Sequence, residues 1–370
     1  MTHRRLTLAD LVFGEPLRWD IFGPGAKAVP STPARPQPLL QKGQVLAPSA
    51  QLNGWLEEGL FAEATPSVLH QLNESNKRLE RLLMALRDSE AADDELRAIA
   101  RDVIAAVDLN PDVALACIFL SQIAGLYAVR HCIETAVVVV LVAHALGRST
   151  AETVTITAAA LTMNVGMVRQ TETFQGKDSA LSPEERAAVQ RHPMDSANML
   201  RSAGVTDQEW LDYVMLHHEN DDGSGYPEGR KAAEIPPNAR LISLADRYCA
   251  HVSARNYRRS ILPNIALQKL FIDGDVDREL AGHFIAQVGA YPPGSLVRLA
   301  CGEVGVVTAR PMADGVLCIH ALRDGAAKPV AAPAERTTAS ADYQIVEALH
   351  EDQAGIRFSM KQIWGELAAL

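Results

Sequence analysis

The stretch that most constrains this chain is 216–227, which reads LHHENDDGSGYP. Two adjacent histidines, His217 and His218, close an apolar helical pattern, and a run of small and polar residues follows. Gly223 and Gly225 allow positive φ or a close approach of the backbone to a ligand, and the final proline fixes the exit direction. The pattern predicts a helix end followed by an ordered turn. The two histidines then either bind a metal ion together or form a solvated pair beside a flexible loop.

The chain divides by pattern into three parts, and we expect a mainly α protein. Residues 1–65 carry short apolar runs punctuated by glycine, which predict a small α/β cap or sensor module. Residues 66–290 show the apolar periodicity of helices. Residues 291–370 contain β-branched runs around glycines and end in a helical pattern. They predict a small β-rich C-terminal module with a closing helix.

Within the helical part, 66–90 carries a stripe of leucines at spacings of three and four, with Asn76 at an a-like position. This combination favours a register-fixed parallel pair of helices, so 66–90 is a candidate dimer helix. A stripe of this length also packs against its own domain, and both interpretations stay open at this point. We expect a homodimer.

Local signals place further boundaries. Ser182 and Glu185 predict a capping box at the start of a helix, and Pro193 predicts an interruption of that helix. A second capping box is expected to begin at Thr206. Residues 326–334 are rich in alanine and proline and predict a linker.

One carboxylate interrupts an apolar stripe in 240–259. Asp246 falls next to leucine, alanine and tyrosine residues that mark the buried face of this predicted helix. A buried aspartate needs a partner, either an arginine or a metal ion. Arg255, Arg258 and Arg259 follow in the same segment and either meet a phosphate or form a solvated helix end.

The letters HHENDDGSGYP resemble the signature of the HD-GYP family, a branch of the HD metal-dependent phosphohydrolases that acts on cyclic di-GMP. The resemblance extends over 114–299 with several motifs in the expected order, and it implies an HD-type helical bundle. It implies that cyclic di-GMP is bound near the turn by Gly223, Gly225, Tyr226, Pro227, Arg255 and Arg258. The implied metal ligands are His131, His192, His217, His218 and Asp246.

The sequence departs from the family in AALTMNVGM at 159–167. The family expects a histidine-aspartate pair here, followed by a hydrophobic residue, glycine and lysine, and Gly166 aligns with that glycine. Met163 stands at the histidine position, Asn164 at the aspartate position and Met167 at the lysine position. Three functional positions are therefore replaced together, and we expect a degenerate catalytic site.

The loss of the aspartate matters because the resemblance implies that this carboxylate bridges two metal ions. Two divalent ions about 3.5–4 Å apart repel one another by roughly 18 kcal/mol at an effective dielectric of about 20. Four imidazoles and one certain carboxylate, with Glu219 nearby, compensate this charge poorly, so we do not expect a two-metal centre. His192, His217 and His218 can instead hold one divalent transition metal such as Fe, Mn, Zn or Ni, with water in an open position.

Composition excludes several other roles. The chain has 370 residues and a net charge of −10, which argues against a surface that coats DNA or RNA but allows a small dianionic nucleotide in a local pocket. Its five cysteines are scattered without a CxxC pair, which is typical of reduced thiols in a cytoplasmic protein. The start of the chain is polar, without a secretory pattern. The apolar runs 113–129 and 135–147 are shorter than a membrane span and predict buried helices of a soluble bundle.

Two functional hypotheses follow. In the first, the protein is a catalytically inactive regulator that binds cyclic di-GMP or presents the surface of the GYP turn to another signalling protein. In the second, the remaining histidines hold one metal and support a residual cyclic di-GMP phosphodiesterase. An intact recognition turn beside a dismantled catalytic pair favours the first hypothesis.

Overall fold

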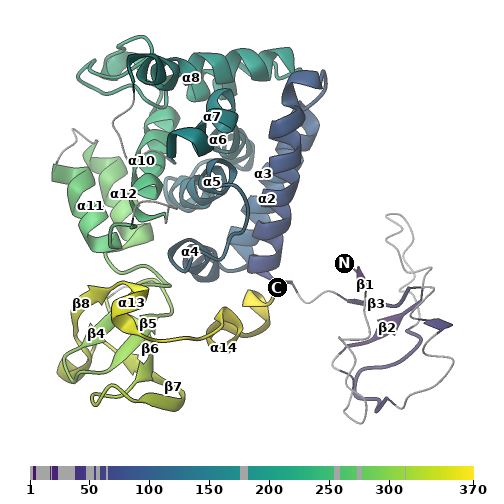
Figure 1. Cartoon of the computed structure of the whole chain (residues 1–370), viewed down its shortest axis with the longest axis vertical. Coiled ribbons are helices and arrows are strands. Elements are labelled where there is room, and N and C mark those ends of the chain that lie inside the picture. Colours follow the sequence, from purple (N-terminus) through teal and green to yellow (C-terminus); the bar gives the residue numbers. More distant parts are fainter. Residues whose placement is uncertain are drawn as a thin grey trace. The chain divides into compact units, whose positions relative to one another are not determined.

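The structure is a computed structural model of the whole chain, and it separates residues 1–66 from residues 67–370 as two compact units (Figure 1). The two units are described in turn. The residues whose structure is described are 3–5, 17, 19–23, 38–46, 54–55, 59–63, 66–175, 182–253, 259–272, 277–312 and 314–370.

The described part of the N-terminal unit is a small antiparallel sheet. Its strands are β1 (His3–Arg5), β2 (Ile21–Phe22) and β3 (Phe61–Glu63), and β3 lies between the other two. Leu17, Ile21, Leu46 and Leu60 are buried together against it. This cluster gives the unit an apolar core of its own.

The second unit is built around a bundle of helices, as the periodicity of 66–290 predicts. Helix α5 lies near the centre and packs against α3, α6, α10 and α12 (Figure 1). The helices are α2 (Val68–Ala85), α3 (Asp93–Leu109), α4 (Pro111–Phe119), α5 (Tyr127–Ala145), α6 (Thr150–Thr162), α7 (Val168–Gln175), α8 (Pro183–Ser202), α9 (Gln208–Leu216), α10 (Pro237–Val252), α11 (Pro263–Ile272) and α12 (Arg278–Val288).

Two helical stretches, Tyr127–Ala145 and Thr150–Thr171, are long and apolar enough to cross a membrane by length and composition. Most of each stretch is buried inside the fold, 83% and 78% of the apolar windows respectively. A helix at the centre of a soluble bundle is apolar on all sides for the same reason, since no face meets water.

The leucine stripe of α2 faces the core of its own domain. Leu72 and Leu79 are fully buried, and Asn76 donates a hydrogen bond from Nδ2 to the carbonyl oxygen of Ala124 at 2.6 Å. Asn76 therefore fixes the connection between α4 and α5 rather than facing solvent. The homodimer stays a prediction.

The helix boundaries follow the capping signals with two differences. The box of Ser182 and Glu185 is confirmed at the start of α8. The expected interruption at Pro193 is wrong, because α8 continues through the proline to residue 202. Asp207, not Thr206, caps α9, and its side chain accepts a hydrogen bond from the backbone N–H three residues later.

The C-terminal module is a five-stranded antiparallel sheet, which confirms the expected β-rich ending of a mainly α chain. Its strands are β4 (Leu296–Leu299), β5 (Val304–Val307), β6 (Cys318–Arg323), β7 (Pro329–Thr337) and β8 (Ile345–Leu349), arranged in the order β7-β6-β5-β4-β8. The short helices α13 (Glu351–Ala354) and α14 (Met360–Trp364) follow. The expected linker at 326–334 is wrong, because most of it belongs to β7. An edge strand tolerates the prolines there, since its outer N–H groups need no partner strand.

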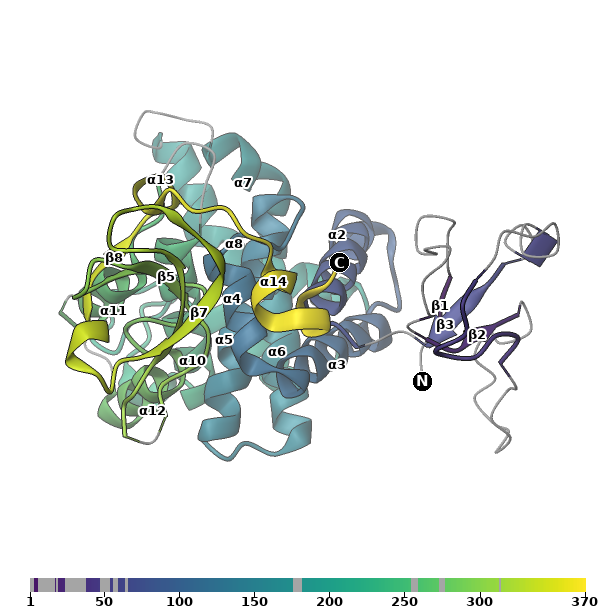
Figure 2. The same cartoon turned by 90° about the horizontal axis from the view of Figure 1, so that it is seen from below.

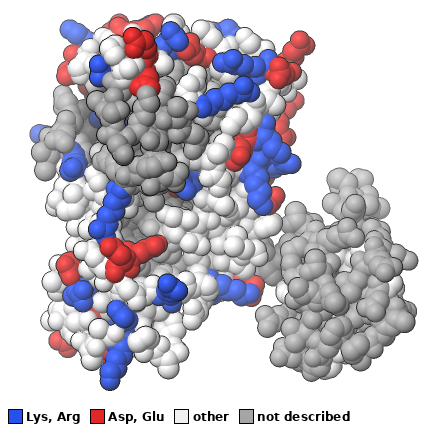
Figure 3. All heavy atoms as spheres, viewed as in Figure 1, with Lys and Arg blue, Asp and Glu red and all other residues white. Residues whose placement is uncertain are grey.

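The sheet belongs to the same compact unit as the helices, and Figure 2 shows the C-terminal segment running beneath α4 toward α2. Arg310 forms an ion pair with Asp112 of α4 at 2.9 Å. A Cβ at Gly294 would lie 3.0 Å from the backbone of Ala116, so glycine allows the chain entering β4 to rest on α4. On the face drawn in Figure 3, basic and acidic side chains are interspersed.

Candidate metal centre

Three histidines from two helices converge at one point. His192 comes from the middle of α8, His217 is the C-cap of α9, and His218 follows it. One ligand nitrogen from each side chain lies within 4.8 Å of the others, and the Nε2 atoms of His192 and His217 are 3.3 Å apart. Because α9 ends here, both adjacent histidines reach the same side, as a cavity at the helix end requires. We call these three residues the histidine triad.

Each of two triad rings is oriented by a carbonyl that its helix leaves without a donor. His192 Nδ1 lies 2.6 Å from the carbonyl oxygen of Val189, and His217 Nδ1 lies 2.7 Å from that of Val214. Pro193 has no N–H to donate to Val189 four residues earlier, and Val214 is in the last turn of α9. Pro193, which was expected to break α8, thus leaves the carbonyl of Val189 free to accept the hydrogen bond that orients the His192 ring.

These contacts fix the tautomers. We assign the ring proton of His192 and of His217 to Nδ1, because only a protonated nitrogen can donate to a carbonyl oxygen. Burial lowers the pKa of His192 to about 3, helped by the nearby charge of His217. Burial also lowers the pKa of His217, and it lowers that of His218 well below its usual range. The triad is therefore neutral near pH 7.

Neutral rings with Nδ1–H leave two Nε2 lone pairs facing one another without a proton between them. Two nitrogens bound to one tetrahedral ion at about 2.0–2.1 Å lie about 3.3–3.4 Å apart, close to the spacing of His192 and His217. Three nitrogen donors suit a borderline divalent transition metal. The donor set of the triad therefore fits one such ion.

His131 and Asp246 form a separate pair beside the triad. His131 Nε2 lies 2.7 Å from Asp246 Oδ1, and both residues are buried. Burial alone would raise the pKa of Asp246, but the hydrogen bond with His131 and the electrostatic influence of that ring hold the pKa well below its usual range. All five residues were expected in one set of metal ligands. In the structure the three triad histidines converge, while His131 and Asp246 contact each other.

The turn after α6 adds no negative charge. Met163 is fully buried, Met167 is half-buried, and the buried Oδ1 of Asn164 has no hydrogen-bond partner among the described residues. A Cβ at Gly166 would lie 2.8 Å from the carbonyl oxygen of His192, so this turn packs directly on the backbone of α8. The turn therefore lies against the α8 segment that carries His192, and Asn164 offers an amide oxygen, which carries no charge.

Glu219, considered as a nearby source of charge, has a different role. Its carboxylate accepts hydrogen bonds from the backbone N–H groups of Glu228, Gly229 and Arg230 at 2.7, 3.1 and 2.9 Å. It is buried and ties the far end of the turn back to the end of α9. This role was not predictable from the sequence, because the three donors are backbone N–H groups, which every residue except proline supplies.

The turn is shaped by its two glycines. Gly223 has a φ of +81°, and a Cβ at Gly225 would lie within 2.5 Å of the backbone at His218, Glu219 and Asn220. The close approach expected of these glycines is therefore to the chain's own backbone. The ring of Tyr226 is tilted by 34° against that of His218, with ring centroids 4.7 Å apart, and Pro227 is half-buried.

Arg255 and Arg258 lie outside the described residues. Among the candidates that the structure describes, the triad, the turn and the pair of His131 and Asp246 occupy one region, formed by the middle of α8, the end of α9 and the facing parts of α5 and α10. The region offers three nitrogen donors and one carboxylate that is hydrogen-bonded to histidine. Such a set can bind one cation and leave part of its coordination shell open.

Known proteins resemble part of this chain. The HD domain family matches residues 120–280. The chain contains an HD domain. A cyclic di-GMP phosphodiesterase from Pseudomonas aeruginosa is 33% identical to the chain over 150 residues, which cover 40% of this chain and 36% of that protein. The cyclic di-GMP phosphodiesterase response regulator RpfG from Xanthomonas campestris pv. campestris is 30% identical over 179 residues, covering 46% of this chain and 44% of that protein.

Among solved structures, the HDG"Y"P protein Bd1817 from Bdellovibrio bacteriovorus aligns with 76% of this chain and 98% of its own, with a TM-score of 0.49 and 14% identity. The chain spans less than half of the length of the curated relatives named here. The HD domain of this chain contains the triad, the neighbouring pair and the turn, because all of them lie between residues 120 and 280.

Proposed function

We propose that this chain is a regulator in cyclic di-GMP signalling whose HD domain binds the nucleotide without hydrolysing it. The observation that carries the proposal is the distribution of negative charge. Asn164 stands where the family places an aspartate, Glu219 is held by three backbone N–H groups, and Asp246 is hydrogen-bonded to His131. Within the described ranges, Asp246 is therefore the carboxylate that is left beside the triad to compensate a cation.

This charge is too small for two neighbouring divalent ions. Their mutual repulsion is roughly 18 kcal/mol at about 3.5–4 Å and an effective dielectric of about 20. A single ion carries half of the total charge and has no neighbour to repel it. His192, His217 and His218 would hold this ion, and it would supply a Lewis-acid contact for a phosphate oxygen.

The chain's own residues supply the remaining recognition. Tyr226 presents a half-buried aromatic ring that is tilted against the ring of His218, and Glu219 fixes the backbone of the turn. A rigid turn beside a cationic centre is suited to an anionic nucleotide. The same turn is exposed at Asp222, Ser224 and Glu228, so a signalling protein could contact it there and bind differently when the conformation of the turn changes. We also propose a cytoplasmic location, where this nucleotide is available.

Three measurements on the full chain test the proposal. Metal content is determined on the protein as isolated, binding of cyclic di-GMP is titrated by calorimetry, and the reaction mixture is chromatographed for linear dinucleotide. We expect about one metal per chain, heat of binding that disappears when a chelator removes the metal, and no linear product. Metal-dependent product would reject the regulator, and the absence of both binding and turnover would leave only a protein-partner role.

A second candidate is a residual phosphodiesterase that uses one metal. The triad favours it, because both Nε2 atoms are already oriented as ligands by the carbonyls of Val189 and Val214. Against it stands Met167, since a thioether cannot replace the positive charge of a lysine near a phosphate. Product formation that rises and falls with metal content, and that disappears in His217→Ala, would favour this candidate.

A further inference from the structure

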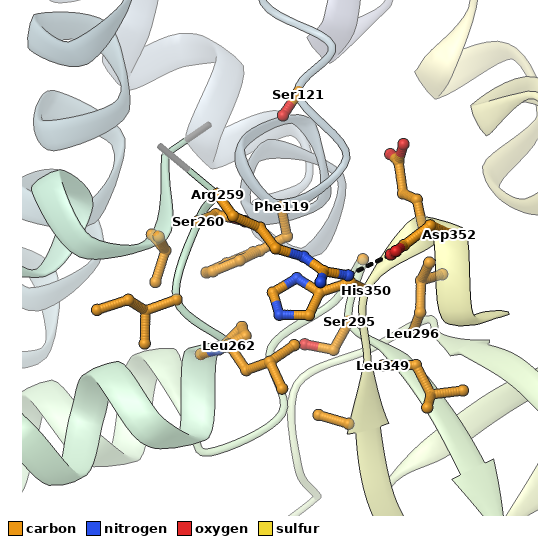
Figure 4. A pocket seen from close by; sticks show the side chains of 16 residues that line it. Phe119, Ser121, Arg259, Ser260, Leu262, Ser295, Leu296, Leu349, His350 and Asp352 are labelled. Carbon is orange, nitrogen blue, oxygen red and sulfur yellow. Dashed lines mark hydrogen bonds and ion pairs between the residues drawn. The ribbon is translucent and has the colours of Figure 1, made fainter. Parts of the chain in front are cut away.

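A cavity lies between the helices and the C-terminal sheet. Its volume is about 470 Å³, within the range of small-molecule sites in proteins. It is lined by the end of α4, the segment from Arg259 to Pro263, the start of β4 and the end of β8 with α13 (Figure 4). None of its lining residues belongs to the triad or the turn, so this is a separate site.

One charged group at the cavity is easily released. Arg259 forms an ion pair with Asp352, and Figure 4 shows the guanidinium lying across the cavity beside His350. The two paired side chains are 54% and 71% exposed, and an ion pair as exposed as this contributes little to stability. A ligand carboxylate can therefore take the place of Asp352 on Arg259 at small cost.

One buried hydroxyl lacks a partner. Ser295 is 4% exposed, and its Oγ has no hydrogen-bond partner among the described residues. Ser295 lines the cavity, and Figure 4 shows its side chain between those of Leu262 and Leu349. A buried hydroxyl without a partner costs free energy, and a ligand atom that bonds to it recovers part of that cost.

The remaining wall is largely apolar. Phe119 and Leu262 come from the helical part, and Leu296 and Leu349 come from the sheet. Arg259 is the single Lys or Arg that lines the cavity within the described part of the chain. The acidic residues Glu351 and Asp352 also line the cavity. One cation beside two acidic residues accommodates a single negative charge better than the two charges of a phosphate monoester.

We propose that this cavity binds a small organic monoanion: a carboxylate with a compact apolar or aromatic body and one polar atom at the far end. The carboxylate pairs with Arg259 at the mouth, the body lies against Phe119 and the leucines, and the polar atom bonds with Ser295. The proposal is independent of the metal centre, because the two sites share no residue.

The test uses 3-(4-hydroxyphenyl)propionate as the probe, titrated into the full chain and followed by ligand-observed NMR. Its primary amide and its amine analogue change the charge, and 3-phenylpropionate lacks the hydroxyl. We expect the carboxylate to bind at least about tenfold more tightly than the amide or the amine, because charge-assisted bonds to arginine are the stronger kind. We expect 3-phenylpropionate to bind a few-fold more weakly than the probe.

Three variants locate the binding. Arg259→Gln should remove the preference for the carboxylate, and Ser295→Ala should remove the difference between the probe and 3-phenylpropionate. Arg298→Gln is the matched control, because Arg298 lies on the same sheet, pairs with Glu347 and does not line the cavity. It should leave every affinity unchanged.

Three outcomes overturn the proposal. The first is that none of the four compounds binds up to about 5 mM, a concentration that reveals millimolar affinities. The second is that the amine binds as well as the carboxylate. The third is that Arg259→Gln and Arg298→Gln affect the affinity for the probe equally. Each variant is folded if its far-UV circular dichroism and thermal midpoint match the parent chain.

Discussion

The glycine at 225 offers the sharpest test of how the turn is built. In Gly225→Ala, the new Cβ would lie 2.4 Å from the backbone nitrogen of Asn220, 2.5 Å from Glu219 Cα and 2.5 Å from the carbonyl oxygen of His218. Ordinary contacts of carbon atoms are about 3.5–4.0 Å, so these atoms must separate by about 1 Å. All three belong to the backbone, which cannot rotate away as a side chain can.

The separation has a calculable cost. Forcing an additional methyl group into a packed region costs about 1–3 kcal/mol. The movement also breaks the hydrogen bond from the N–H of Tyr226 to the carbonyl oxygen of His218 at 3.1 Å, worth about 1 kcal/mol. We therefore expect Gly225→Ala to lower the free energy of unfolding by about 2–4 kcal/mol. At a urea dependence of about 3 kcal/mol per molar, the midpoint falls by about 1 M.

Gly282→Ala is the matched control, measured by circular dichroism in the same urea series. Gly282 lies in α12, and a Cβ there would meet nothing within 4 Å. Alanine is favoured over glycine in a helix by about 0.5–1 kcal/mol, so this variant should be slightly more stable than the parent chain. A Gly225→Ala midpoint equal to that of the parent, with Gly282→Ala shifted upward, would show that the turn does not depend on this contact.

Three further predictions concern the site. His217→Ala should abolish the metal content of the isolated protein, measured by mass spectrometry, while His70→Ala on an exposed position of α2 should retain it. Met163→His combined with Asn164→Asp should raise the metal content per chain, and an unchanged stoichiometry would contradict the assignment of that turn. The pKa of His192 is about 3 when folded against a usual 6.5, so as the pH falls below 6.5 the unfolded chain takes up the proton first. The contribution of this group to the stability of metal-free protein should therefore be fully present above pH 6.5. Below that, the free energy of unfolding should fall by up to about 1.4 kcal/mol per pH unit toward pH 3. Urea midpoints that stay constant between pH 6 and about 4 would contradict the burial of His192 in its neutral form.

Much of the fold follows from local pattern. The apolar periodicity of 66–290 predicts the helices, and Ser182 with Glu185 predicts where α8 begins, because a capping box involves neighbours in sequence. Pro193 was misread because a proline inside a helix usually breaks it. It is tolerated here since the carbonyl that it leaves without a donor, at Val189, accepts from His192. This hydrogen bond takes the place of the missing backbone one, and it can be recognised only from the position of the His192 ring in the structure.

The candidate site divides in the same way. His217 and His218 could be placed together from the sequence, because adjacent residues at a helix end must share a region, whereas His192 was predicted only from the resemblance to the HD-GYP signature. The role of Glu219 was not predictable, since its partners are backbone groups ten residues away that carry no side-chain signature. The cavity at Arg259 and Ser295 was missed for a related reason. It is formed by segments from Phe119 to Asp352, and each of them is unremarkable when read by itself.

The charges at the centre also connect the metal to the proposed nucleotide. With Asn164 neutral and Glu219 held by the turn, Asp246 is the carboxylate within the described part of the chain that is left beside the triad to oppose the two positive charges of a divalent ion. The phosphates of a cyclic dinucleotide would supply the missing negative charge. The ion and the nucleotide should then raise each other's affinity by the same factor, because binding free energies around a closed cycle must agree. A metal affinity that does not change when cyclic di-GMP saturates the protein would place the nucleotide, and with it the proposed regulatory function, away from the histidine triad.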